Sequence, residues 1–408
     1  MKQYIFLTNQ YLPRPGATGM CVHSIATELV KRGNVVTTLC YSEDANFHEE
    51  QFDGVKVYKI PVPKLLRNID PTSVYQKYSV RFLSLFAKIV HVRNYPLRSK
   101  TLVDRYVKKI IPLLSDHIHT TIVASYTPLK GVLAMLQILN KYNNISTIFY
   151  STDTLSNERG NAGLLPASFR TKMGLKWEKM IFDKVDKAII MECHKEYYYG
   201  NQFRDFHEKM YVANFPLLKK SSVNYEVGCK KKIKSLVYAG TLYRDLRNPT
   251  FVCKLLNMVS ADISIHVTFM GGGDCDDIMK YYSDRSAGKI EFLGMQPYSI
   301  AIDSINQADI LISIGNKKSP MAPSKIYEYM STGKPIIHVY SWKNDPCIEP
   351  LSKYGNSFLI DENESVDIES FKLFIEKSTI LSYDLVKKRF YTATPEYSAD
   401  LVEGLLNK

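Results

Sequence analysis

The segment at residues 322–337 places a helix start, a lysine and a glutamate close together. Pro323 suits the first turn of a helix, so the backbone N–H groups of Ser324 and Lys325 should point out of the helix start, where such groups bind anions. Glu328 follows one turn later and could accept two hydrogen bonds from a ribose diol while the backbone holds a diphosphate. The alternative is that Glu328 lies on an exposed helix face without a ligand.

A second segment, residues 238–249, places arginine beside another helix start. Gly240 ends a predicted strand, and Arg244 and Arg247 follow before Pro249 begins a helix. The planar guanidinium group binds phosphate through two parallel hydrogen bonds, so this loop is a candidate phosphate site. Two solvated surface arginines are the alternative interpretation.

The first predicted strand leads into a glycine-containing loop at residues 11–19. Gly16 and Gly19 would let the backbone approach a ligand, and the helix that follows offers unpaired N–H groups to an anion. The spacing is not that of the GxGxxG fingerprint, so dinucleotide binding is not indicated. A plain turn between strand and helix is the alternative.

Polar residues also follow two central strands of the first half: Tyr126 and Thr127 follow one strand, and Asp153 follows the next. All three are expected at the carboxyl edge of a sheet, where open α/β sheets bind ligands. Asp153 could position a hydroxyl group or assist its proton transfer, or it could cap a helix. His23 and His194 are expected to be packed residues without a catalytic role.

The elements that position these residues alternate between strand and helix. β-branched and aromatic runs predict strands, and apolar residues at helical spacing predict the helices between them, a pattern typical of βαβ units and a parallel sheet. The strands predicted in the first half are residues 4–7, 35–41, 55–60, 121–125, 147–150 and 188–191, with helices near 75–92, 100–114, 129–142 and 170–184.

The same alternation restarts after residues 214–234, which lack hydrophobic periodicity and predict an interdomain connection. Strands are predicted at 236–239, 263–270, 290–293, 310–314 and 335–339, with helices near 249–259, 275–284, 298–307 and 323–332. The expected fold class is therefore α/β, with two Rossmann-like domains facing each other across a cleft.

Composition limits the classes of function. A chain of 408 residues favours two domains, and 45% hydrophobic residues exclude general disorder. Seven cysteines without CxxC or Cys/His ligand spacing argue against a disulfide framework and a structural zinc site, and favour a reduced compartment. No stretch of 18 uncharged apolar residues is present, so we do not expect an integral membrane protein.

The positive charge is concentrated in one region. The chain has a formal net charge of +12, and residues 54–150 carry 15 lysines and arginines against three acidic residues, Asp70, Asp104 and Asp116. A field of this sign attracts an anionic partner. An anionic membrane surface is the candidate, since basic residues near such a surface contribute about 1 kcal/mol each; a core-facing helix with a solvated charged rim is the alternative. Nucleic acid is not expected, because no reading helix or aromatic-basic RNA motif accompanies the charge.

Several motifs occur in the order and spacing of glycosyltransferase family 4, which has the GT-B fold. They are Tyr11-Leu-Pro with Gly16 and Gly19, Ala26-Thr-Glu-Leu-Val-Lys-Arg-Gly33, the Gly240 loop, Phe269-Met-Gly-Gly-Gly273, Phe292-Leu-Gly294, Ala308-Asp-Ile-Leu-Ile312 and the segment at residues 323–335. The chain resembles this family over nearly its full length, and especially its bacterial members that build capsule and O-antigen chains.

The resemblance implies an acceptor-binding domain at residues 1–213 and a nucleotide-sugar-binding domain at residues 214–393, with a C-terminal helix near 394–408 packing back on the first domain. It implies Asp153, Arg247 and Lys325 as catalytic residues, with Tyr126 and Thr127 on the acceptor side. The donor-binding residues that it implies are Gly16, Gly19, Gly240, Thr241, Arg244, Gly271, Gly272, Gly294, Met295, Pro323, Ser324 and Glu328.

Two positions depart from the family pattern. Pro320 stands where the first glutamate of a Glu-x7-Glu pair is usual, which removes a carboxylate that normally contacts the donor sugar. Thr241 replaces the arginine that usually follows the glycine of the second loop. The diphosphate charge would therefore be neutralised by Arg247 first, with Arg244 or Lys325 as the other candidates.

The implied reaction transfers a hexosyl or N-acetylhexosaminyl group from a nucleotide-sugar, UDP-linked by expectation, to a lipid-diphosphate-linked glycan in surface polysaccharide biosynthesis. The anomeric configuration would be retained. No metal or other cofactor is expected, and the enzyme would be cytoplasmic and peripheral on the inner face of the plasma membrane. The alternatives are a non-hydrolysing GT-B nucleotide-sugar epimerase and a non-catalytic nucleotide-sugar-binding scaffold.

Overall fold

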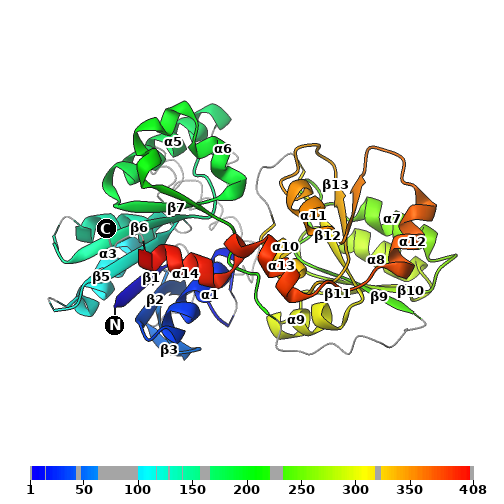
Figure 1. The fold of residues 1–408 in the computed structure, drawn as a ribbon, viewed down its shortest axis with the longest axis horizontal. Coiled ribbons are helices and arrows are strands. Elements are labelled where there is room, and N and C mark those ends of the chain that lie inside the picture. The colour runs from blue at the N-terminus through cyan, green and yellow to red at the C-terminus, as the bar shows by residue number, and fades with distance from the viewer. Residues whose placement is uncertain are drawn as a thin grey trace, which may run out of the picture. The chain divides into compact units, whose positions relative to one another are not determined.

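The computed structural model describes residues 2–13, 15–42, 47–62, 100–115, 117–126, 129–139, 141–156, 166–220, 233–317 and 323–404. The chain divides into two compact units (Figure 1). Unit 1 is Met1–Pro216 with Pro395–Lys408, and unit 2 is Leu217–Thr394. The expected division at residues 213 and 214 lies close to this one. The helix expected at residues 75–92 lies outside the described residues.

Unit 1 is built on a sheet with the strand order β3-β4-β2-β1-β5-β6-β7-β8 among the described residues. Its strands are β1 (Gln3–Leu7), β2 (Val35–Ser42), β3 (His48–Phe52), β4 (Val55–Pro61), β5 (Thr120–Ser125), β6 (Ile145–Ser151), β7 (Lys187–Met191) and β8 (Met210–Ala213). The helices that accompany them are α1 (Ala17–Lys31), α3 (Lys100–Ile110), α4 (Leu129–Leu139), α5 (Ala167–Lys184) and α6 (Lys195–Tyr198).

The sheet of unit 1 is mainly parallel, as expected, and has one antiparallel pair at its edge. β3 pairs with β4 in the antiparallel direction, while the other described pairs of this sheet are parallel. The two strands are joined by Asp53 and Gly54, which both have positive φ, at 47° and 80°. This is the backbone of a tight hairpin turn, for which Asp-Gly is a preferred sequence. The edge strand β3 was not predicted, although the turn residues Asp53-Gly54 indicated a hairpin.

Unit 2 contains a parallel sheet with the strand order β11-β10-β9-β12-β13-β14. Its strands are β9 (Lys234–Ala239), β10 (Ile265–Met270), β11 (Ile290–Gly294), β12 (Ile310–Ile314), β13 (Ile336–Tyr340) and β14 (Ser357–Asp361). Its helices are α7 (Thr250–Val259), α8 (Asp276–Arg285), α9 (Tyr298–Gln307), α10 (Lys325–Ser331), α11 (Ile348–Tyr354), α12 (Ile368–Lys377) and α13 (Tyr383–Arg389). In chain order this is the doubly wound 3-2-1-4-5-6 arrangement.

The last helix, α14 (Pro395–Gly404), returns to unit 1 and packs against α1. Arg32, at the end of α1, forms ion pairs with Asp400 at 2.7 Å and Glu403 at 2.8 Å. Asn34 donates a second hydrogen bond to Glu403 at 2.7 Å. These contacts tie the C-terminal helix to the domain that contains the N-terminus. No helix in the described parts of the chain is long and apolar enough to cross a bilayer.

Candidate functional site

The strand order of unit 2 reverses between β9 and β12, which are hydrogen-bonded neighbours. Open α/β sheets bind ligands beyond the carboxyl ends of the strands at this reversal point. The loop of Gly240 follows β9, and Asn316 follows β12 after Gly315. The candidate site is therefore built from the loops after these two strands and from the helix α10.

Arg247 links the two loops. Its Nε donates a hydrogen bond to Oδ1 of Asn316 at 2.6 Å, and Lys317 N–H donates to the carbonyl oxygen of Leu246 at 2.8 Å. Arg247 also faces the hydroxyl group of Tyr238; burial raises the pKa of Tyr238 to about 12, and the arginine acts in the opposite direction. Asn316 and Tyr238 thus hold the guanidinium group, and the Lys317–Leu246 hydrogen bond joins the two loops.

Lys325 and Glu328 complete a charged group with Arg247. Burial lowers the pKa of the Lys325 ammonium group, the positive charge of Arg247 lowers it further, and Glu328 opposes both effects. Glu328 is partly buried and accepts a hydrogen bond from the Tyr298 hydroxyl at 3.0 Å. Two cations therefore lie within electrostatic range of each other, with one carboxylate beside them. An anion bound there would relieve the repulsion between the cations.

The structure does not bring Arg244 into this group. Its guanidinium is exposed and forms an ion pair with Asp277, and its Nε donates to the carbonyl oxygen of Asp274 at 3.1 Å. Its backbone N–H donates to the carboxylate of Asp274 at 2.8 Å. Arg244 thus ties its loop to the start of α8. The ion pair with Asp277 separates Arg244 from the group of Arg247 and Lys325. The sequence alone could only rank the two arginines as candidate phosphate-binding residues.

The predicted glycine positions of unit 2 pack tightly against one another. A side chain on Gly271, whose φ is +151°, would place its Cβ 1.7 Å from the carbonyl oxygen of Gly240. The backbone N–H of Gly271 donates to the carbonyl oxygen of Gly294 at 2.8 Å. A Cβ on Gly272 would lie 2.9 Å from Cε of Met295, whose side chain is largely exposed. The loops after β9, β10 and β11 therefore form one connected edge.

Helix α10 is shorter than the helix predicted at residues 323–332. The helix begins at Lys325 and has seven residues, with Ser324 as the N-cap and no hydrogen bond from the serine side chain to the helix backbone. Pro323 precedes it, and Pro320 lies outside the described residues. Thr241 contributes its carbonyl oxygen to the hydroxyl group of Tyr238 at 3.1 Å. The charged side chains therefore characterise the site better than the helix start does.

In unit 1, the glycines of the first loop have a structural explanation. Gly16 is the N-cap of α1. A Cβ on Gly19 would lie 1.9 Å from the carbonyl oxygen of Gln10, so glycine is needed where the helix crosses the loop backbone. His23 is buried between the hydroxyl of Tyr11, at 2.8 Å, and the carboxylate of Asp53, at 3.0 Å. It packs between the two, as expected for a histidine without a catalytic role.

Asp153 follows β6 and is partly exposed, with its Oδ1 3.9 Å from Nε2 of His194. Burial lowers the pKa of His194 to about 4, so the imidazole is neutral near pH 7 and this contact is not an ion pair. Tyr126 is buried after β5, and Thr127 lies outside the described residues. The structure thus leaves the carboxylate of Asp153 without a charged histidine beside it at neutral pH.

A buried carboxylate that sequence reasoning did not identify supports the loop of Asp153. Glu178, on α5, accepts hydrogen bonds from the backbone N–H of Leu155 at 2.8 Å and from the hydroxyl groups of Tyr197 at 2.6 Å and Tyr198 at 3.2 Å. Burial raises the pKa of Glu178 to about 7, although these donors act in the opposite direction. Sequence spacing gave no sign of it, because its partners lie 19 to 23 positions away.

Sequence analysis also did not identify Asn316 and Tyr298 as site residues. Each acts through one hydrogen bond to a predicted residue, Asn316 to Arg247 and Tyr298 to Glu328. The bonded pairs are 69 and 30 positions apart in the sequence. Tyr298 opens α9 directly after Pro297, and this helix start is the one local signal that could have drawn attention to it.

The chain has the GT-B fold of known glycosyltransferases. Sucrose-phosphate synthase from Thermosynechococcus elongatus matches with a TM-score of 0.56 at 11% identity, covering 100% of this chain and 95% of that one. HepE from Anabaena, in complex with UDP and glucose, matches with a TM-score of 0.52 at 14% identity, covering 99% and 97%. WaaG, a glycosyltransferase involved in lipopolysaccharide biosynthesis, matches with a TM-score of 0.53 at 13% identity, covering 98% and 100%.

These likenesses establish the fold. No protein-family model matches the chain, and no curated protein matches it in sequence. Membership of glycosyltransferase family 4, and of its capsule and O-antigen branch, stays a prediction.

Glu178 provides a test of the pH dependence of stability. Because its pKa is raised from the usual 4.5 to about 7 in the folded state, the folded chain binds a proton that the unfolded chain has lost between these pH values. The free energy of unfolding should therefore fall as pH rises from about 4.5 to 7, by on the order of 3 kcal/mol from this group. Glu178→Gln should remove this part of the decline, as measured by urea unfolding.

The matched control is Glu192→Gln, an exposed glutamate of the same unit. It should unfold with the pH dependence of the wild type. Parallel curves for the wild type and Glu178→Gln would show that Glu178 is ionised throughout this range.

Proposed function

We propose that the protein is a glycosyltransferase that transfers a sugar from a nucleotide-sugar and stabilises the departing nucleoside diphosphate with Arg247 and Lys325. The observation that carries this proposal is the grouping of these two cations with Glu328 at the reversal point of a parallel sheet. Negative charge develops on the leaving diphosphate during sugar transfer. Preorganised cations in a partly desolvated site stabilise that charge more than flexible ones in water.

Arg247 is the residue to which we assign the main phosphate contact. With Nε hydrogen-bonded to Asn316, the terminal nitrogens of the guanidinium are the part that can bind a phosphate through two bonds. Lys325 supplies a second positive charge from the first residue of α10. Burial lowers the pKa of its ammonium group, and a bound diphosphate would act in the opposite direction by favouring the charged form.

We assign Glu328 to the ribose of the nucleotide. One oxygen of its carboxylate accepts the Tyr298 hydroxyl, and a carboxylate has about four lone-pair positions. Capacity therefore remains for two ribose hydroxyl groups, and the bond to Tyr298 orients the group that receives them. The connected loops of Gly271 and Gly294 would lie beside the base.

The finer features of the reaction are also proposals. A UDP-linked donor is supported by the neighbours, one of which is described as a complex with UDP and glucose and another as a structure from E. coli bound with UDP-2-fluoro glucose. A lipid-diphosphate-linked glycan acceptor is supported by the likeness to WaaG, which acts in lipopolysaccharide biosynthesis. Retention of configuration, transfer of a hexosyl or N-acetylhexosaminyl group, and independence from a metal complete the proposal.

Attachment to an anionic membrane is supported by the charge of residues 54–150. Within this region the described helix α3 carries Lys100, Arg105, Lys108 and Lys109. Arg105 donates to the carbonyl oxygen of Pro61, and Nζ of Lys109 lies 3.7 Å from the centre of the Tyr58 ring. Lys100 and Lys108 are therefore the residues of α3 that we assign to the membrane surface.

Glu328→Gln should weaken UDP binding about tenfold in a calorimetric titration, since a charge-assisted acceptor of the ribose hydroxyl groups is lost. Glu349→Gln, on the neighbouring helix α11, is the matched control and should bind UDP like the wild type. Equal affinity of Glu328→Gln and the wild type would contradict the ribose assignment.

Arg247→Ala should lower kcat/KM for sugar transfer by about 10²–10³, the effect of removing one group that stabilises developing charge. Arg244→Ala should change it by less than about threefold, because Arg244 is paired with Asp277. The donor for this assay is found by screening nucleotide-sugars for a rise in the melting temperature. UDP binding without any transfer would favour the scaffold, and epimerised sugar without an acceptor would favour the epimerase.

Replacing Lys100 and Lys108 by glutamine should reduce binding to vesicles that contain anionic lipid. Two residues at about 1 kcal/mol each correspond to a loss of about 30-fold in partition, measured by co-sedimentation. The control is Lys172→Gln with Lys176→Gln on α5 of the same unit, which should bind normally. If the α3 variant binds these vesicles as well as the wild type, Lys100 and Lys108 are not part of the membrane-binding surface.

A further inference from the structure

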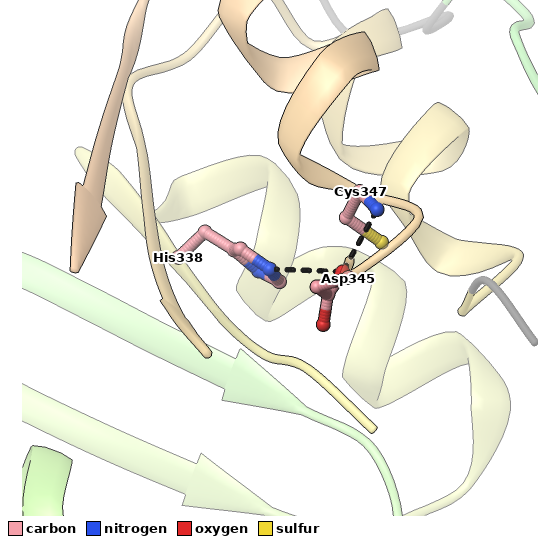
Figure 2. Close-up of side chains that lie close together, drawn as sticks. All are labelled: His338, Asp345 and Cys347. Atoms are coloured by element: carbon pink, nitrogen blue, oxygen red, sulfur yellow. Dashed lines mark hydrogen bonds and ion pairs between the residues drawn. The ribbon is translucent and has the colours of Figure 1, made fainter. Parts of the chain in front are cut away.

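His338, Asp345 and Cys347 form a buried group in unit 2 that includes none of the residues assigned above. His338 lies in the middle of β13, and Asp345 and Cys347 lie in the turn between β13 and α11. All three side chains are buried, and their potential ligand atoms lie within 4.8 Å of one another. Figure 2 shows Asp345 between the imidazole ring and the cysteine. The residue types are nitrogen, oxygen and sulfur ligands for a metal ion.

The hydrogen bonds of the group are incomplete. Oδ1 of Asp345 accepts the backbone N–H of Cys347 at 2.8 Å and lies 3.5 Å from Nε2 of His338 (Figure 2). Neither Nε2 of His338 nor Oδ2 of Asp345 has a hydrogen-bond partner among the described residues. A polar atom buried without a partner lowers stability, and more so when it carries charge. Two such atoms in one group are therefore available to a ligand.

The surroundings orient the histidine as a metal ligand. Nδ1 of His338 lies 3.0 Å from Oγ of Ser313, on the neighbouring strand β12. When Nδ1–H donates to this hydroxyl group, the lone pair of Nε2 points toward Asp345 and can bind a cation. A hydrogen bond from the second ring nitrogen is the usual way in which proteins orient a metal-bound histidine. The ring of Tyr340 stacks on the other side, with ring centres 6.0 Å apart.

The chemistry of the donor set selects the metal. Imidazole, carboxylate and thiolate together suit Zn²⁺, which binds them at about 2.0–2.3 Å. Ligand atoms around a tetrahedral zinc lie roughly 3.3–3.6 Å apart. Nε2 of His338 and Oδ1 of Asp345 already lie at this distance, 3.5 Å apart. The most widely separated pair of ligand atoms would have to approach by about 1 Å. Three protein ligands leave a fourth position for another ligand.

We propose that His338, Asp345 and Cys347 bind one Zn²⁺ ion that links β13 to the turn before α11. The sequence gave no such expectation, because the spacing His-x6-Asp-x-Cys is not a familiar zinc pattern. The ion would neutralise the buried carboxylate and the thiolate. A Cβ on Gly315 would lie 2.0 Å from Oδ2 of Asp345, so the group also supports the residue that precedes Asn316.

The test is the metal content of the full-length protein, purified without chelators and measured by mass spectrometry. The wild type should contain about one zinc per chain, and Cys347→Ser and His338→Gln should bind it at least about tenfold more weakly. Cys253→Ser is the matched control, since Cys253 is a buried cysteine of the same unit outside the group, and it should keep the zinc.

Two further measurements on the wild type keep the test valid if a variant does not fold. Removing zinc by dialysis against a chelator should lower the melting temperature by several degrees, and adding zinc back should restore it. Cobalt in place of zinc should give a thiolate-to-metal absorption band that Cys253→Ser retains. Absence of zinc, of the thermal shift and of the cobalt band would overturn the proposal and leave a buried histidine–aspartate contact. Zinc retained by both ligand variants would also overturn it, because the metal would then lie elsewhere.

These measurements need no donor and no acceptor. Failure of the zinc proposal would therefore leave the glycosyltransferase proposal untouched.

Discussion

The hydrogen bond from Nε of Arg247 to Oδ1 of Asn316, at 2.6 Å, joins the loops that follow β9 and β12. These two strands meet where the order of the sheet reverses, which is the position at which open α/β sheets commonly bind ligands. An arginine held at Nε keeps its terminal nitrogens in a fixed plane. A group that must meet a phosphate in one geometry benefits from this, because little side-chain freedom is lost on binding.

The same arrangement is electrostatically incomplete in the absence of a ligand. Arg247 and the burial of Lys325 both disfavour the charged form of the lysine, and Glu328 compensates in part. Two neighbouring cations in a folded site favour anion binding, because a bound anion offsets the repulsion between them. In our proposal, the carboxylate of Glu328, held by Tyr298, would favour a ligand that presents hydroxyl groups beside its phosphates.

The hydrophobic pattern of the sequence predicted most elements of the fold. Runs such as Leu236–Ala239 and Ile310–Ile314 are buried central strands, and their β-branched and aliphatic residues left little ambiguity. The edge strand β3 carries His48, Glu49, Glu50 and Gln51, so it has no apolar run to detect. Its turn residues Asp53 and Gly54 were the signal, and turn chemistry rather than hydrophobicity defines such an edge.

The site was less predictable than the fold, because its key contacts join distant parts of the chain. Arg244 and Arg247 are three residues apart and alike in the sequence, yet Asp277 pairs with the first and Asn316 with the second. The roles of the glycines could not be predicted either, because they also depend on contacts with other parts of the chain. Gly19 fits an approach to a ligand as well as the crossing of α1 over Gln10, and only the position of the Gln10 carbonyl oxygen explains it by packing.

Buried polar groups in both units support loops at the carboxyl edges of the sheets. Glu178 binds the backbone of the loop after β6, and the group of His338 and Asp345 lies against the loop after β12 through Gly315. A loop that must hold a charged side chain steady needs contacts that are directional, which apolar packing does not provide. Burying such groups lowers stability unless each is satisfied. Glu178 meets this condition with three hydrogen-bond donors, and the His338–Asp345 group would meet it with the cation that we propose.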